Sequence, residues 1–235
     1  MFMHNSTAQG IALPQLTIYG KNYTDTPWLL ITGGRAPDAS WLSKLPPTEK
    51  TYAADHGLDT CHRQNIIPDY ILGDGDSAAP ATWNWGKSLG VPVEEFPTAK
   101  DLTDTQLALE KMQKAPAIII TGAFGGRFDH LYSLLFSCAN QKTPCLLSDE
   151  QETVLFVKDN EEITLHFHQH PHAISLLPFT AACTGVNINN VRWPLTGAAL
   201  TQTFPNAVSN ELLPDQEKLT VNIKQGILGI YCHWQ

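Results

Sequence analysis

The chain has 235 residues, of which 43% are hydrophobic, so it is long enough to bury a full core in one large domain or two smaller ones. A formal net charge of −8, with dispersed Lys and Arg, argues against nucleic acid as a partner. The first 14 residues resemble neither a signal peptide nor a membrane anchor, and the five cysteines contain no C-x-x-C pair. We therefore expect a cytoplasmic protein without a membrane partner, a disulfide framework or a thiolate zinc site.

The first two-thirds of the chain alternate short apolar runs with polar or helical stretches. Two of these stretches, 101–114 and 128–141, have the composition and apolar spacing of helices. The alternation is typical of a parallel α/β sheet, in which helices cross between parallel strands. The predicted strands are 28–34, 51–55, 70–74, 117–123 and 144–150.

The pattern changes from about Glu152, where short strand-like runs are separated by turn residues and no long helix is visible. Such a pattern predicts an antiparallel sandwich. We therefore predict an N-terminal parallel α/β (Rossmann-like) domain over residues 1–155 and an all-β sandwich domain over 156–235.

Acidic residues follow the predicted strands, at the edge of a parallel sheet where ligands bind. Asp55 ends one strand, Asp74 and Asp76 follow the next, and Asp101 and Asp104 open a helix. Mg²⁺ takes one or two carboxylates and completes its octahedron with water and phosphate oxygens, so these acids predict a magnesium site. Asp74 and Asp76 are spaced to serve one metal, although D-G is also ordinary turn chemistry. We expect Asp101 to act with them, whereas Asp104 has helix capping or dipole relief as an alternative role.

A glycine-rich segment, TGAFGGRFDH (121–130), joins the most apolar predicted strand to a helix. The helix N-terminus offers unpaired N–H groups and a positive dipole end to an anion. Gly122, Gly125 and Gly126 permit close backbone approach, and Arg127 is suited to a forked phosphate contact. The segment predicts a phosphate site; the alternative is a turn followed by a solvated arginine.

Four histidines alternate in HFHQHPH and would line one face of an extended segment. A polar strand face is the preferred interpretation, and a metal site is the alternative. The four are His166, His168, His170 and His172.

Six segments, taken in order, resemble the successive motifs of thiamine pyrophosphokinases. They are AADHG (53–57), PDYILGDGDS (68–77), KDLTD (100–104), GAFGGRFDH (122–130), NNVRWPL (189–195) and AVSNE (207–211). Two positions depart from the family pattern: His56 replaces a usual glycine, and Gly75 replaces a usual aromatic residue.

The resemblance implies transfer of a pyrophosphoryl group from ATP to the hydroxyl of thiamine, with Mg²⁺ as cofactor and release of AMP. The implied metal ligands are Asp74, Asp76 and Asp101. The implied catalytic residues are these three acids and Arg127. The remaining residues implied for nucleotide binding are Asp55, Asp104, Gly122, Gly125, Gly126 and Asp129.

The resemblance also implies that Trp193 stacks on thiamine, with Ser209 and Asn210 nearby, in a site shared by two subunits of a homodimer. Taken by itself, a tryptophan on a β segment is more often a packing residue. Two other functions stay open. One is pyrophosphoryl transfer to another hydroxymethyl heterocycle, such as a pterin, and the other is a catalytically silent nucleotide- or thiamine-binding protein.

Overall fold

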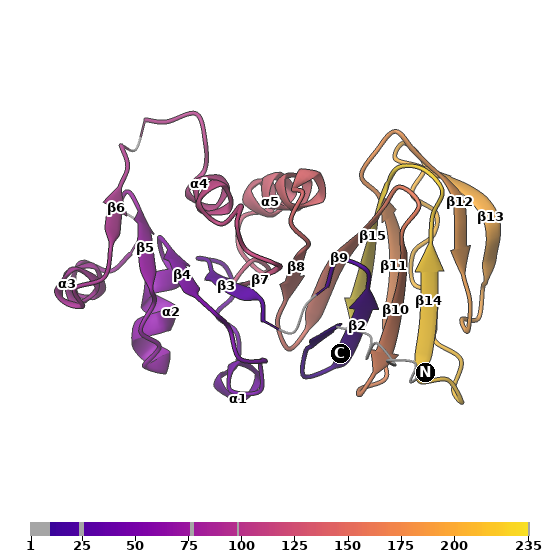
Figure 1. The fold of residues 1–235 in the computed structure, drawn as a ribbon, viewed down its shortest axis with the longest axis horizontal. Coiled ribbons are helices and arrows are strands. Elements are labelled where there is room, and N and C mark those ends of the chain that lie inside the picture. The colour runs from indigo at the N-terminus through magenta and orange to yellow at the C-terminus, as the bar shows by residue number, and fades with distance from the viewer. Residues whose placement is uncertain (1–9, 24–25, 76–77, 98, 235) are drawn as a thin grey trace, which may run out of the picture.

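The computed structural model describes residues 10–23, 26–75, 78–97 and 99–234. The described chain forms two sheets (Figure 1). One has nine strands in the order β11-β15-β9-β8-β7-β3-β4-β5-β6, and the other has six in the order β1-β2-β10-β14-β12-β13. The parallel strands and the helices lie at one end of the long axis, and the antiparallel strands lie at the other (Figure 1).

Six strands of the larger sheet are parallel, and helices cover both of their faces (Figure 1). The strands are β3 (Trp28–Ile31), β4 (Thr51–Ala54), β5 (Tyr70–Gly73), β6 (Val93–Glu95), β7 (Ile118–Thr121) and β8 (Cys145–Ser148). The helices are α1 (Ala39–Leu42), α2 (Gly57–Gln64), α3 (Pro80–Ser88), α4 (Asp104–Lys111) and α5 (Phe128–Asn140). Strands covered on two faces need continuous apolar runs, which explains why every residue of β3, β4, β7 and β8 is buried.

Alternate residues of these strands belong to two hydrophobic cores. Leu29 and Ile31 share one core with Leu58 of α2, whereas Leu30 shares the other with Leu109 of α4 and Leu134 of α5. The period of two along a strand therefore assigns α2 and the α4–α5 pair to opposite faces of the sheet.

The remaining strands pair antiparallel. They are β1 (Gly10–Ala12), β2 (Leu16–Gly20), β9 (Glu152–Lys158), β10 (Glu162–Phe167), β11 (Ala173–Pro178), β12 (Ala182–Ile188), β13 (Leu195–Thr201), β14 (Lys218–Asn222) and β15 (Ile227–His233). β9 pairs with β8, and it carries the larger sheet onward into β15 and β11. The fold is therefore mixed α/β, as the sequence predicts.

Sheet membership does not follow the expected division after residue 155. β1 and β2 lie within the predicted first domain, yet β2 pairs with β10, with Ile18 opposite Leu165. In the other direction, β9, β11 and β15 join the sheet of the parallel strands. The N-terminal segment alternates buried and less buried residues, which suits an antiparallel strand covered on one face. Within the described residues, every helix is too short or too polar to span a bilayer.

Candidate active site

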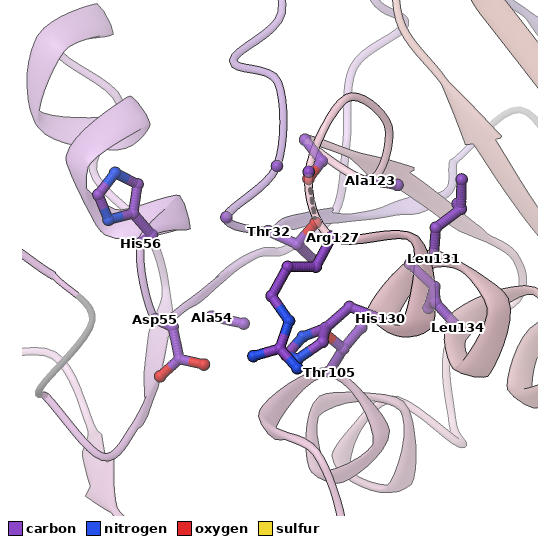
Figure 2. Close-up of a pocket in the computed structure, with 14 residues that line it drawn as sticks. Thr32, Ala54, Asp55, His56, Thr105, Ala123, Arg127, His130, Leu131 and Leu134 are labelled. Atoms are coloured by element: carbon purple, nitrogen blue, oxygen red, sulfur yellow. Dashed lines mark hydrogen bonds between the residues drawn. The ribbon is translucent and has the colours of Figure 1, made fainter.

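A cavity of about 380 Å³ opens at the carboxyl ends of β3, β4 and β7 (Figure 2). Four of the residues selected from the sequence line it: Asp55, Gly122, Gly126 and Arg127. Thr32, Thr105 and His130 also line it, and the sequence patterns did not single them out. Their common feature is position, since each lies just beyond a strand or within the first turn of a helix, where open sheets bind ligands.

Two loops in close contact line the cavity, one after β3 and one after β7. The Gly122 carbonyl accepts hydrogen bonds from the Thr32 hydroxyl at 2.7 Å and from the Gly34 N–H at 2.6 Å. Gly122 has φ +70°, and a Cβ at this position would lie 2.2 Å from the Thr32 carbonyl oxygen. Glycine is therefore required here both by the left-handed backbone and by the space.

α5 points its N-terminus toward these loops, with Arg127 at the N-cap position and no side chain capping the helix. Arg127 pairs with Asp129 at 2.6 Å, and the two side chains are 73% and 64% exposed. The Arg127 side chain extends into the cavity beside His130 (Figure 2). Because an exposed ion pair is weak, the guanidinium can exchange Asp129 for an anionic ligand.

Three carboxylates gather beside the cavity, from the ends of β4 and β5 and the start of α4. Asp55 Oδ1 accepts the Asp74 N–H at 3.3 Å, and Gly73 permits this approach because a Cβ there would lie 2.1 Å from the same oxygen. Lys100 contacts two of these acids. Its Nζ lies 3.1 Å from Asp104 Oδ2 and 3.5 Å from Asp74 Oδ2. We call Asp55, Asp74, Asp104 and Lys100 the acidic cluster.

Asp104, rather than Asp101, is the acid of the α4 segment that joins this cluster. Asp101 is exposed, whereas the Asp104 side chain is 12% exposed. Helix capping does not account for Asp104, because the Thr103 hydroxyl accepts the Gln106 N–H and caps α4. Asp76 lies outside the described residues.

The acidic cluster fits a hard divalent cation. Asp104 Oδ1 is buried and has no hydrogen-bond partner among the described residues. Within that part of the chain, these carboxylates are not arranged so that three of them could hold one metal ion together. Mg²⁺ nevertheless needs only one or two protein carboxylates when water and phosphate complete its octahedron, so Asp74 and Asp104 are sufficient.

The acidic cluster should make the stability of the metal-free protein depend on pH. Burial, followed by the charge of Asp104, raises the pKa of Asp55 to about 8, against about 3.9 in an unfolded chain. Between these values the folded chain binds more protons, so the contribution of Asp55 is full below pH ~4 and is lost as the pH rises toward 8. We expect thermal unfolding in EDTA to shift to lower temperature between pH 5.5 and 8, with a smaller shift in Asp55→Asn. An equal shift in both proteins would contradict this assignment.

The two departures from the family pattern have local structural explanations. His56 has φ −58° at the start of α2, an ordinary helical value, so no glycine is required there. Its Nδ1 lies 3.3 Å from Asp59 Oδ2. Gly75 has φ +72° and lies against Trp83 of α3, where a Cβ would approach the indole to 2.8 Å. A larger residue at 75 would therefore displace Trp83.

A second cavity of about 320 Å³ lies beside β13 and is lined by Trp193 and Asn210. Trp193 is 53% exposed, so it is not the packing residue that a β-domain tryptophan usually is. Asn210 fixes its backbone, accepting the Trp193 N–H at 3.1 Å and donating to the Trp193 carbonyl at 2.8 Å. Ser209 is exposed, has φ +57° and does not line the cavity.

The face of the Trp193 ring already contacts a cation. The Arg192 guanidinium carbon lies 4.8 Å from the ring centroid, and Arg192 also pairs with Glu211 at 3.0 Å. The indole therefore accepts a cation–π contact in this structure, as a cationic ligand ring would require of it.

The alternating histidines contact different partners. The rings of His166 and His168 lie 5.4 Å apart, and His168 Nε2 lies 2.8 Å from the Thr17 hydroxyl. The ring of His172 instead lies 6.0 Å from that of His233. In the described part of the chain, no three potential metal ligands converge at these histidines.

Comparisons with known proteins match both parts of the chain. A family model described as "Thiamin pyrophosphokinase, catalytic domain" matches residues 45–147, and one described as "Thiamin pyrophosphokinase, vitamin B1 binding domain" matches residues 162–228. The thiamine pyrophosphokinase of Bacillus subtilis (strain 168) is 27% identical over 179 residues, which cover 74% of this chain and 82% of that protein. Thiamine pyrophosphokinase 2 of Oryza sativa subsp. japonica is 25% identical, over 71% of this chain and 66% of that one.

Solved structures match over a larger part of the chain. The crystal structure of thiamine pyrophosphokinase from Bacillus subtilis superposes with a TM-score of 0.76 at 25% identity, covering 88% of this chain and 99% of that one. Yeast thiamin pyrophosphokinase gives a TM-score of 0.70 at 16% identity, over 90% of this chain and 88% of that one, and supports the fold alone.

Proposed function

Since the chain belongs to the thiamine pyrophosphokinase family, we propose that it transfers the pyrophosphoryl group of ATP to the hydroxyl of thiamine, giving thiamine diphosphate and AMP. One observation carries this function: the two family matches fall, in order, on the two cavities. The catalytic-domain match contains the acidic cluster and the glycine loop, and the B1-binding match contains Trp193 and Asn210. We also propose that the protein acts in the cytoplasm.

The reaction forms a bond between the thiamine hydroxyl oxygen and the β-phosphorus of ATP. The bond from that phosphorus to the oxygen bridging the α- and β-phosphates breaks, AMP leaves with that oxygen, and the hydroxyl proton is lost. Little covalent chemistry falls to the protein, so positioning and charge stabilisation supply most of the rate.

The residues around the first cavity suit the nucleotide. Asp74 and Asp104 would hold Mg²⁺, with Asp76 as a further ligand proposed from the sequence, whereas the exposed Asp101 lies outside the acidic cluster. When bound, the ion neutralises phosphate charge. The N–H groups of Gly125 and Gly126 and the uncapped N-terminus of α5 would bind the phosphates, and Arg127 would add a forked donor. Asp129 holds Arg127 until phosphate arrives. Residues 1–155 would thus bind ATP and Mg²⁺, and residues 156–235 would bind thiamine.

A homodimer would unite the two cavities. The first lies among the parallel strands, while β13 beside the second lies at the opposite end of the molecule (Figure 1). Large apolar side chains are exposed near both: Phe128 at 77% and Tyr132 at 54% on α5, and Phe204 at 69% after β13. A second copy that brings its Trp193 to the first cavity would cover these side chains and complete the active site.

The function is tested by incubating the purified protein with ATP, Mg²⁺ and thiamine, and measuring AMP and thiamine diphosphate. We expect both products in equal amounts. A pterin alcohol offered in place of thiamine is the control acceptor. Preferential use of the pterin would support the other pyrophosphokinase activity, and binding of ATP and thiamine without product would indicate a silent binding protein.

Replacing Arg127 should weaken ATP binding and slow transfer. Arg127→Ala removes a forked, charged phosphate contact, which is worth about 1.5–3 kcal/mol, or roughly 10- to 100-fold in kcat/KM for ATP. Arg127→Lys should recover part of the loss, because lysine keeps the charge but not the fork. Steady-state kinetics with varied ATP measure this. Unchanged kinetics in Arg127→Ala would mean that Arg127 is a solvated surface residue and does not bind phosphate.

A further inference from the structure

Lys100 occupies the position between carboxylates that a metal ion would take. It lies on the loop between β6 and α4, and its Nζ contacts Asp104 Oδ2 at 3.1 Å and Asp74 Oδ2 at 3.5 Å. The Lys100 side chain is 15% exposed, so its ammonium is largely removed from water. The Pro97 carbonyl accepts a third contact from Nζ at 3.2 Å and holds the lysine in this orientation.

The acidic cluster depends on this ammonium. Its three carboxylates come from separate loops, and Lys100 forms ion pairs with both Asp74 and Asp104. Carboxylates in a partly buried site repel each other strongly unless a cation lies between them.

A divalent cation that binds the Oδ2 atoms of Asp74 and Asp104 competes with the ammonium of Lys100 for them. Mg²⁺ binds carboxylate oxygens at about 2.0–2.1 Å, and Oδ2 of Asp74 and Oδ2 of Asp104 are the atoms that face Lys100. A second positive charge at the distance of Lys100 Nζ would raise the energy of the bound ion. Metal binding at these two oxygens therefore favours departure of the lysine.

We propose that Lys100 is a built-in placeholder for the divalent cation, holding Asp74 and Asp104 together in the metal-free protein and giving up their Oδ2 atoms when the metal binds. This inference rests on the proposed function for its choice of a divalent cation. It makes Lys100 a positioning residue: the lysine keeps the carboxylates of β5 and α4 near their metal-binding arrangement and sets the metal affinity of the nucleotide-free protein.

The test is a titration of the full chain with Mn²⁺ alone, without nucleotide. The electron paramagnetic resonance signal of free Mn²⁺ measures how much of the ion is bound. Lys100→Met removes the competing charge and should bind Mn²⁺ at least about tenfold more tightly than wild type. Lys100→Arg, which keeps a cation, should stay near wild type. Lys111→Met is the matched control, because Lys111 pairs at 2.7 Å with Glu94 outside the cluster, and it should also leave Mn²⁺ affinity unchanged.

Thermal unfolding gives a second readout that does not depend on activity. In EDTA, Lys100→Met should melt below wild type, and saturating Mn²⁺ should raise its melting temperature more than it raises that of wild type. If Lys100→Met does not fold, Lys100→Gln keeps a polar group and is used in its place.

Unchanged or weaker Mn²⁺ binding in the folded variant would overturn the placeholder role. The outcome is separate from the proposed function, which is decided by product formation in the wild-type protein. If Lys100→Met gains Mn²⁺ affinity but the wild-type chain makes no thiamine diphosphate, the placeholder role is supported and the proposed function is rejected.

Discussion

Asp74→Asn is expected to lower kcat for thiamine diphosphate formation by a factor of roughly 10²–10³, equivalent to about 3–4 kcal/mol of transition-state stabilisation. The Asp74 carboxylate contacts Lys100 at 3.5 Å, and its backbone N–H is held by Asp55. Asparagine keeps the shape and one oxygen but removes the charge that binds the metal. The measurement is the initial rate at saturating Mg²⁺, with circular dichroism to confirm folding. A near-wild-type rate would remove Asp74 from the metal site.

The same assay separates Asp104 from Asp101, which differ by three residues in the chain. Asp104→Asn should resemble Asp74→Asn, because its carboxylate faces the same lysine and carries a buried oxygen without a partner among the described residues. Asp101→Asn is the matched control, and its exposed side chain should change kcat by less than about threefold, as surface substitutions usually do. The reverse order would restore Asp101 as the ligand proposed from the sequence.

The second large effect is expected from Trp193→Ala, which should raise the KM for thiamine about tenfold while leaving the KM for ATP nearly unchanged. A desolvated cation–π contact is worth about 1–2 kcal/mol, and the exposed Trp193 ring already accepts Arg192 on its face. Trp193→Phe should lose less, because it keeps an aromatic face. The melting temperature serves as the control. A variant that unfolds, or an equal rise of both KM values, would favour a structural role for Trp193.

Mixed dimers test whether Trp193 and Asp74 of one site come from different chains. An Asp74→Asn chain refolded with an equal amount of a Trp193→Ala chain would give half heterodimers, each with one intact composite site. At low thiamine, activity should therefore reach about a quarter of the wild-type value, well above either variant by itself. Activity no higher than the mean of the two variants, or full activity in a monomer, would mean that one chain holds a complete site.

The sequence by itself determined the features that depend on neighbouring residues. Continuous apolar runs such as 28–31 and 118–121 predict buried parallel strands, because only strands covered on both faces need apolar residues at every position. Acids placed directly after such strands, and glycines before α5, predict a ligand site at the carboxyl edge. Asp55, Gly122 and Arg127, which this pattern indicates, line one cavity.

Only the tertiary structure decided what depends on contacts between distant segments. β2 pairs with β10 across more than 140 residues, as Ile18 opposite Leu165 shows, and no local pattern records such a partner. Asp101 and Asp104 share a helix-start signal, so their spacing does not reveal which carboxylate faces Asp55 and Asp74. Lys100 opens the KDLTD segment, but that segment does not reveal its role, because a lysine becomes part of a site only when folding brings carboxylates from other loops within reach of its ammonium.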